Sequence, residues 1–430
     1  HIEMDFPALP PSLTEVDIIG NQKSNEIRII GLSLTEKRNK TSIYPQPNPI
    51  YRSATPAITL DTAILQGKFV GYHKRLNLPD GKIIQDDLFS GKQTEINIPI
   101  APDGSFSAKI PTRYPIQQKL IFGDRYIPFY IEPTDTLYIE TYLDELFAPY
   151  RYSGEIEQNC VHSTYRGKNA RINYELREIR LKNISETEDW IKSLNTLSTQ
   201  KYYTSEENKF KVKLEYVNSK YNQGEISDTS YHLSILNNYY NFIYHIFVYM
   251  NIIDKNIINE YSIKNIDYTS FVEYYLPFLM LLESWRAMTT PPNWEYSDFI
   301  KALEKRNIDL SNTEKETLKF VFGEIQTPPD NVERTIESFN KKSEKEQISM
   351  REEKLRALRK QTYETYFGPS TDFTCQLINT RSIIRLIHSL DRKLTETEIK
   401  EFTAPITDRR LLKVIDQTNF SYKPQSLQGH

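Results

Sequence analysis

The two cysteines, Cys160 and Cys375, are the residues of this chain with the most direct access to covalent chemistry. They lie far apart, and neither belongs to a Cys-x-x-Cys motif, in which one thiolate attacks a disulfide and a neighbouring thiol resolves the product. Cys160 lies two residues before His162, and a histidine beside a thiol can activate a nucleophile. No oxyanion-stabilising motif accompanies that pair. We therefore interpret both cysteines as small buried apolar residues, and leave a disulfide between them open.

The seven histidines do not form a recognisable metal or catalytic motif. His388 precedes Asp391 by three positions on an expected helix, and we interpret them as a surface ion pair rather than a catalytic dyad. His232 and His245 share a helical region but lie thirteen residues apart, which does not make a metal site without further ligands. His245 is surrounded by aromatic and aliphatic residues in the sequence, so we expect a core histidine with satisfied hydrogen bonds.

Three pairs of adjacent acids do not have the spacing of a glycosidase site. Adjacent acids point to opposite faces of a strand and diverge by about 100° on a helix, whereas glycoside hydrolysis needs two facing carboxylates. The chain also lacks the phosphate-loop, HExxH and GxSxG motifs. We therefore expect no catalytic, cofactor-binding or metal-binding residue, no cofactor, and no enzymatic activity in the chain as given. The acid pairs are Asp86-Asp87, Glu206-Glu207 and Glu352-Glu353.

The composition favours a globular protein of two or three domains, because 430 residues exceed one ordinary hydrophobic core. The formal net charge is -3 and basic residues are spread among acidic ones, which argues against nucleic acid and anionic membranes as partners. Only 14 glycines are present, which argues against a glycine-rich nucleotide loop. The 29 tyrosines fit half-exposed strand faces and large helix contacts, which we favour over a carbohydrate-stacking surface.

The pattern before residue 150 predicts strands. Residues 60–145 alternate between apolar and other residues in short runs, separated by turn signals such as those at 79–81 and 102–104. About seven strands at this spacing predict an antiparallel sandwich. Upstream, residues 27–32 predict a further strand and residues 41–44 predict its partner.

The pattern after Gly167 predicts helices, because apolar residues recur at three- and four-residue spacing. The apolar stretch 233–253 carries several asparagines and a histidine, which predicts a buried core helix rather than a membrane span. Capping boxes, in which a side chain caps the first turn and a glutamate three positions later reaches back, mark several expected helix starts. These are Ser185 with Glu188, Thr204 with Glu207, Ser311 with Glu314, Asp330 with Glu333, and Thr395 with Glu398.

The fold class expected from these patterns is α+β, with an N-terminal antiparallel β-sandwich followed by a larger all-α domain. The expected boundaries are 1–150 for the sandwich with its extra N-terminal strands, and 165–420 for the helical domain. The polar segment 421–430 is expected to be a linker or tail.

A series of short motifs carries a resemblance to a known family. It includes Gln66–Tyr72, Asp103–Phe106, and Arg125–Pro133 followed by Asp135-Thr136-Leu137. This order resembles the β-domain that precedes the thioredoxin domain in TlpA-like thiol-disulfide oxidoreductases of Bacteroidetes. The segment Gly167–Leu176 is similar to that family's entry into a helical domain, and Leu394–Leu412 resembles the helices that lead into the thioredoxin fold.

The resemblance implies an exported protein of the periplasm or cell envelope, with lipid anchoring left open, and a thioredoxin-like domain as partner, in the same gene or a separate one. The family's Trp-Cys-x-x-Cys motif is absent, so no catalytic residue carries over to any position here. The expected function is a non-catalytic recognition and scaffolding region that positions a thioredoxin domain absent from this chain. The alternative is a stand-alone cell-envelope binding protein for glycan, peptide or protein. A hydrolase with an unrecognised site is a third hypothesis.

Overall fold

The structure of the chain is a computed structural model. It describes residues 10–13, 15–20, 27–33, 58, 61–76, 78–123, 125–147, 163–183, 197–252, 275–284, 293–366 and 369–424. Contacts divide the chain into two compact units. The first comprises His1–Asp86, Gln93–Ile246 and Ser270–Tyr275, and the second comprises Asp87–Lys92, Phe247–Thr269 and Leu276–His430.

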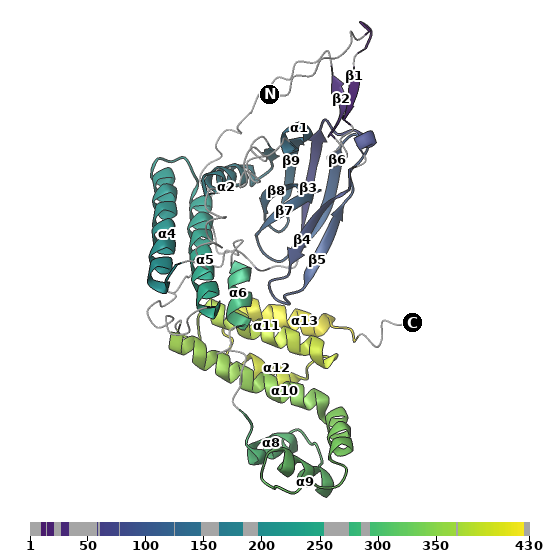
Figure 1. Ribbon diagram of the computed structural model, residues 1–430, viewed down its shortest axis with the longest axis vertical. Coiled ribbons are helices and arrows are strands. Elements are labelled where there is room, and N and C mark those ends of the chain that lie inside the picture. Colours follow the sequence, from purple (N-terminus) through teal and green to yellow (C-terminus); the bar gives the residue numbers. More distant parts are fainter. Residues whose placement is uncertain are drawn as a thin grey trace. The chain divides into compact units, whose positions relative to one another are not determined.

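The first unit contains two four-stranded sheets and a two-stranded ribbon (Figure 1). One sheet has the strand order β10-β9-β3-β6 and the other has the order β5-β4-β7-β8, while β1 and β2 pair with each other. The strands are β1 Glu15–Gly20, β2 Ile27–Ser33, β3 Asp61–Val70, β4 Gly81–Asp86, β5 Gln93–Ile98, β6 Ser105–Thr112, β7 Ile116–Phe122, β8 Arg125–Ile131, β9 Thr136–Tyr142 and β10 Thr164–Arg166.

Alternating burial along the strands produces the core between the two sheets. In β6 every second residue from Phe106 to Thr112 is buried, as the period of a strand requires. Phe69 of β3 stacks on Phe122 of β7 with ring centroids 4.5 Å apart. Because these strands belong to different sheets, the two inner faces meet as in a sandwich. The predicted α+β class with an N-terminal sandwich is thereby confirmed.

One strand pairing differs from the sequence expectation, and another cannot be compared. β3 pairs with β9 in parallel, from Ile64 opposite Thr136 onward, so the sandwich is not wholly antiparallel. The last long strand therefore returns beside the first, which short-range turn signals cannot predict. The strand β2 pairs with β1, and the expected partner at 41–44 lies outside the described residues.

Gly67 allows the close packing of β3 against its neighbours. A Cβ atom at this position would lie 2.0 Å from the Ile139 carbonyl oxygen and 2.3 Å from the Phe106 ring. No side chain fits in that space, so the Phe106 ring lies directly over the strand backbone. Gly67, the first glycine of the motif Gln66–Tyr72, is therefore required for packing.

Tyrosine rings make several of the contacts of helices in the first unit. Tyr221 and Tyr231 stack at 4.2 Å, and Tyr165 meets Tyr174 edge-on at 5.4 Å. A small apolar cluster of Ile179 and its neighbours joins three helical segments. The predicted packing role of the abundant tyrosines is confirmed at these contacts. The segments are η1 Lys74–Leu76, α1 Leu143–Leu146, α2 Ala170–Asn183, α4 Thr199–Asn222 and α5 Asp228–Ile252, of which the residues up to Ile246 belong to this unit.

The second unit is built around α11, which is buried on nearly every side. The long helix α10 contacts both α9 and α11, and α13 also packs on α11. A separate apolar cluster around Phe299, Leu303 and Phe339 holds α8 and α9 against α10. The helices are α6 Tyr275–Ser284, α8 Tyr296–Glu304, α9 Asn312–Val321, α10 Val332–Tyr366, α11 Phe373–Leu390, α12 Glu396–Thr403 and α13 Arg409–Ser421.

Two of the predicted capping boxes are confirmed, at Ser311 before α9 and Thr395 before α12. Two predictions are wrong. Thr204 lies inside α4, whose N-cap is Ser198, and Asp330 is separated from α10 by Asn331 in a left-handed conformation. In both cases the spacing matches although the residue does not stand immediately before the helix, which is the position of an N-cap. The predicted box at Ser185 lies outside the described residues.

The stretch 233–253 lies almost wholly within α5, as expected for a helix. Among the described residues, no helix combines the length and apolar character needed to cross a membrane.

The predicted boundaries at 150, 165 and 420 follow the change from strands to helices, whereas the compact units follow contacts. Those boundaries stay a prediction. The expected tail begins where α13 ends, and residues 425–430 lie outside the described part.

Candidate functional site

Cys375 is chemically protected. It lies on α11 as a free cysteine with only 2% of its surface exposed. Burial raises the pKa of its thiol to about 12. Since the thiolate is the reactive form, a thiol with this pKa is a poor nucleophile at neutral pH. The interpretation of Cys375 as a buried apolar residue is confirmed, while Cys160 and His162 lie outside the described residues.

His388 and Asp391 each contact Tyr422. Asp391 is the left-handed C-cap residue of α11, and its carboxylate accepts a hydrogen bond of 2.8 Å from the Tyr422 hydroxyl. The His388 ring meets the ring of the same tyrosine edge-on at 5.2 Å. Burial, with Lys92 nearby, lowers the pKa of His388. The arrangement closes the end of a helix, which is a structural role.

His245 has a buried carboxylate partner that sequence reasoning missed. Its Nδ1 lies 2.7 Å from Oε2 of Glu206, and Glu206 Oε1 accepts from Lys209 at 2.9 Å. Burial alone would raise the pKa of Glu206, but the hydrogen bonds from His245 and Lys209 lower it overall. His245 is thus hydrogen-bonded as expected, but it is partly buried and not a core residue. His232 contacts the Asp228 carbonyl oxygen at 2.8 Å.

The adjacent acids diverge as predicted. Glu352 meets Ser382 at 2.5 Å, whereas Glu353 accepts from Arg306 at 2.6 Å. Asp87 accepts from the backbone amides of Phe89 and Ser90 and so stabilises the turn of its own loop. In the described part, no group of three or more histidine, cysteine, aspartate or glutamate side chains gathers as metal ligands.

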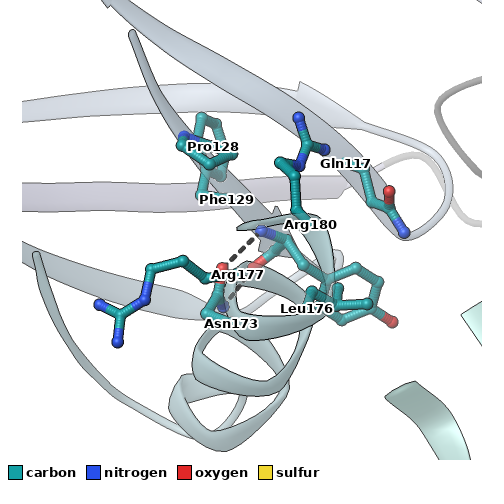
Figure 2. Close-up of a pocket in the computed structure, with 8 residues that line it drawn as sticks. Gln117, Pro128, Phe129, Asn173, Leu176, Arg177 and Arg180 are labelled. Carbon is teal, nitrogen blue, oxygen red and sulfur yellow. Dashed lines mark hydrogen bonds between the residues drawn. The ribbon is translucent and has the colours of Figure 1, made fainter. Parts of the chain in front are cut away.

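Two segments that carry the family resemblance meet in the first unit. Asn173 of α2 accepts from the Tyr130 amide at 2.6 Å and donates to the Tyr130 carbonyl at 2.9 Å (Figure 2). Tyr130 belongs to β8, the last strand of its sheet. The asparagine side chain therefore pairs with the strand backbone as a neighbouring strand would. This contact protects a sheet edge from pairing with other chains.

The same two segments make further polar contacts. Asn169 donates to Asp135 at 2.8 Å in a buried contact, and Lys168 pairs with Glu132 at 2.9 Å at the surface. Burial is the largest influence on Asp135 and raises its pKa. The motifs Phe129–Pro133, Asp135-Thr136-Leu137 and Gly167–Leu176 thus hold α2 against the sheets. Their clearest role in the structure is to join strands to helix.

A small cavity of about 20 Å³ lies within this region (Figure 2). Its volume is close to that needed for a single water molecule. Gln117 and Arg177 both line it but are directed to opposite sides in Figure 2, and Arg177 donates to the Ser163 carbonyl at 2.6 Å. The cavity is therefore a packing feature and is too small for an organic ligand.

A larger depression of about 530 Å³ lies on the outer face of the β10-β9-β3-β6 sheet. Sequence reasoning missed it, because it forms only when separate strands are placed in register. It includes the half-exposed ring of Tyr138, the exposed side chains of Gln66 and Ser107, and a wall formed by residues 99–101. The complete lining is Gln66, Gly67, Pro99, Ile100, Ala101, Ser105, Phe106, Ser107 and Tyr138.

Comparisons with known proteins add no further evidence. No family model matches the chain. No curated protein and no solved structure matches it either. The geometry of the two compact units therefore carries the functional argument.

Proposed function

We propose that this chain is the non-catalytic recognition and scaffolding region of an exported protein similar to the thiol-disulfide oxidoreductases named above. In this role it positions a thioredoxin-like domain, which carries the redox chemistry, and contributes a surface that selects substrates. The observation that carries the proposal is the burial of Cys375, whose thiol has a pKa of about 12. A group protected in this way suits a scaffold and does not suit the attacking thiol of an exchange reaction.

An insulin-reduction assay tests the non-catalytic part of the proposal. We expect the purified chain to leave the rate of insulin reduction by dithiothreitol unchanged. A Cys160→Ala, Cys375→Ala double variant is the matched control, because it removes both thiols of the chain. Acceleration by the natural chain that disappears in this variant would overturn the proposal.

The coding sequence after residue 430 tests the partner. A thioredoxin domain with a Cys-x-x-Cys motif in the same or an adjacent gene is the expected result. If neither gene encodes such a domain, the scaffolding role is contradicted. Cell fractionation of the native host gives a second readout, because the proposal expects the protein in the periplasm or envelope fraction.

A stand-alone cell-envelope binding protein is the second proposal. The depression beside Tyr138 favours it, because ligand sites combine apolar surface with a few placed polar groups. Saturable ligand binding by the chain in a host that lacks any thioredoxin partner would support this role. Binding that requires the thioredoxin domain would favour the first proposal.

A further inference from the structure

We propose that the outer face around Tyr138 is a binding site for a neutral saccharide. This inference rests on the proposed binding role of the chain and specifies the ligand class. The site lies wholly within the first compact unit. Its components come from strands β3, β6 and β9 and from the segment that precedes β6.

Strand register places four side chains in one row across the sheet. Arg166 is opposite Tyr138, Tyr138 is beside Gln66, and Gln66 is opposite Ser107. The neighbours of these residues along the strands, such as Leu65 and Leu137, are buried in the core. Since side chains alternate between the two faces of a sheet, the row lies on the outer face.

Arg166 supports the tyrosine ring from one side. Its guanidinium lies 5.3 Å from the centroid of the Tyr138 ring and 3.8 Å from the Glu140 carboxylate. Arg166 and Gln66 approach Tyr138 from opposite neighbouring strands. Tyr138 therefore lies between a cation on the β10 side and the depression on the β3 side. A ring that already makes such a contact has less conformational freedom to lose on binding.

The lining carries no net charge. All nine residues that line the depression are uncharged. The hydroxyl of Ser105 donates to Asp103 at 2.7 Å, so its oxygen is oriented to accept a hydrogen bond. An anionic ligand such as a nucleotide needs basic groups, which this lining does not supply. Charge complementarity therefore favours a neutral ligand.

A saccharide matches the lining better than an extended peptide does. Peptides that add to a sheet bond to free backbone groups at its edge. Here the backbone of β3, at the centre of the depression, already pairs with β6 on one side and β9 on the other. A ligand therefore meets side chains. The ring of Tyr138 can stack on the C–H face of a sugar ring, and the amide of Gln66 and the hydroxyl of Ser107 can bond to the sugar hydroxyls.

Calorimetric titration of the whole chain with neutral hexasaccharides tests the proposal. The panel comprises β-1,4-glucan, β-1,3-glucan, xylan, mannan and chitin hexamers. We expect at least one to bind with a Kd between about 10 μM and 1 mM. Tyr138→Ala should weaken that binding by roughly tenfold or more, and Gln66→Ala should weaken it by roughly fivefold.

Tyr126→Ala is the matched control. Tyr126 is also a half-exposed strand tyrosine in the first unit, with Lys119 Nζ 4.6 Å from its ring centroid, but it does not line the depression. We expect its affinity to stay within about twofold of the natural chain. Circular dichroism checks that each variant is folded.

Three outcomes would overturn the inference. They are the absence of binding by every hexasaccharide at roughly 10 mM, equal weakening by Tyr126→Ala and Tyr138→Ala, and selective binding of a neutral peptide pool at the Tyr138 face. None of these affects the insulin assay or the search for a thioredoxin domain, so failure of this inference is distinguishable from failure of the scaffolding role.

Discussion

At the scale of single residues, the side chain of Asn173 should contribute strongly to the stability of the fold, because it pairs with the backbone of Tyr130. Replacement by alanine leaves the amide and carbonyl of Tyr130 without the side chain that pairs with them. Because an unsatisfied buried polar group is costly, we expect Asn173→Ala to lower the free energy of unfolding by about 2–3 kcal/mol. Urea denaturation measures the change. Asn97→Ala, at an exposed strand position, should cost less than about 0.5 kcal/mol, and equal costs would contradict the argument.

Glu206 should make stability depend on pH. Its pKa is lowered in the folded state, so the ionised form contributes stability at neutral pH. That contribution is complete above the unfolded-state pKa of about 4.3 and is lost as pH falls through the lower folded-state value. Glu206→Gln should therefore cost roughly 1–2 kcal/mol at pH 7, and the difference should shrink in acid. A difference that is constant with pH, measured by urea unfolding, would show that the pKa of Glu206 is the same in the folded and unfolded states.

Asp135 provides the opposite test. Burial raises its pKa in the folded state, so the fold favours the protonated form. Its ionisation at neutral pH therefore opposes folding. As pH falls through the raised folded-state pKa, the natural chain should gain stability relative to Asp135→Asn. Urea unfolding over the same pH range gives the stability difference between the natural chain and each variant. This difference should change with pH in opposite directions for Glu206 and Asp135. A change in the same direction for both would contradict the argument that hydrogen bonding dominates at Glu206 and burial at Asp135.

At the scale of elements, Arg381 joins the loop Asp87–Lys92 to helices of the second unit. Its guanidinium binds Glu283 of α6 through two hydrogen bonds, of 2.9 and 3.1 Å, and donates to the Leu88 carbonyl. Arg385 binds the same carboxylate. Burial would raise the pKa of Glu283, but the two arginines lower it overall. The cluster is a buried ion network that depends on complete pairing.

Arg381→Met should therefore be strongly destabilising. It leaves a buried carbonyl and a half-paired carboxylate, and we expect a loss of about 3–5 kcal/mol in unfolding free energy. Arg385→Met is the control, because Arg385 is 37% exposed and solvent can replace much of its contribution. It should cost about 1 kcal/mol. If the two variants are equally stable, the network does not hold the loop.

The sequence predicts local features of these elements better than their long-range contacts. Alternation and turn signals locate the strands between 61 and 142, because both depend on neighbouring residues. The parallel pairing of β3 with β9 depends on packing across more than sixty positions and leaves no local signal. Tyr138 illustrates the same limit for the site. Its row exists only once β3, β6, β9 and β10 are in register.

At the scale of the whole molecule, Cys375 reports on the opening of the helical unit. In a Cys160→Ala background it is the remaining thiol of the chain, and it lies on the central helix α11. A buried thiol reacts with a disulfide reagent such as DTNB only after the surrounding structure opens. We expect labelling in the native protein to be at least ~10³-fold slower than in urea, as opening free energies of several kcal/mol imply.

Arg381→Met tests whether the labelling rate of Cys375 follows the free energy of unfolding. If the variant loses about 3 kcal/mol of stability and labelling follows global opening, the labelling rate should rise by roughly two orders of magnitude, since each tenfold change corresponds to about 1.4 kcal/mol. Arg385→Met should raise it by less than about tenfold. Native labelling of Cys375 at nearly the rate of the unfolded chain would have a different meaning. The thiol would then be accessible and reactive, and the chain could take part in disulfide exchange itself instead of positioning a domain that does.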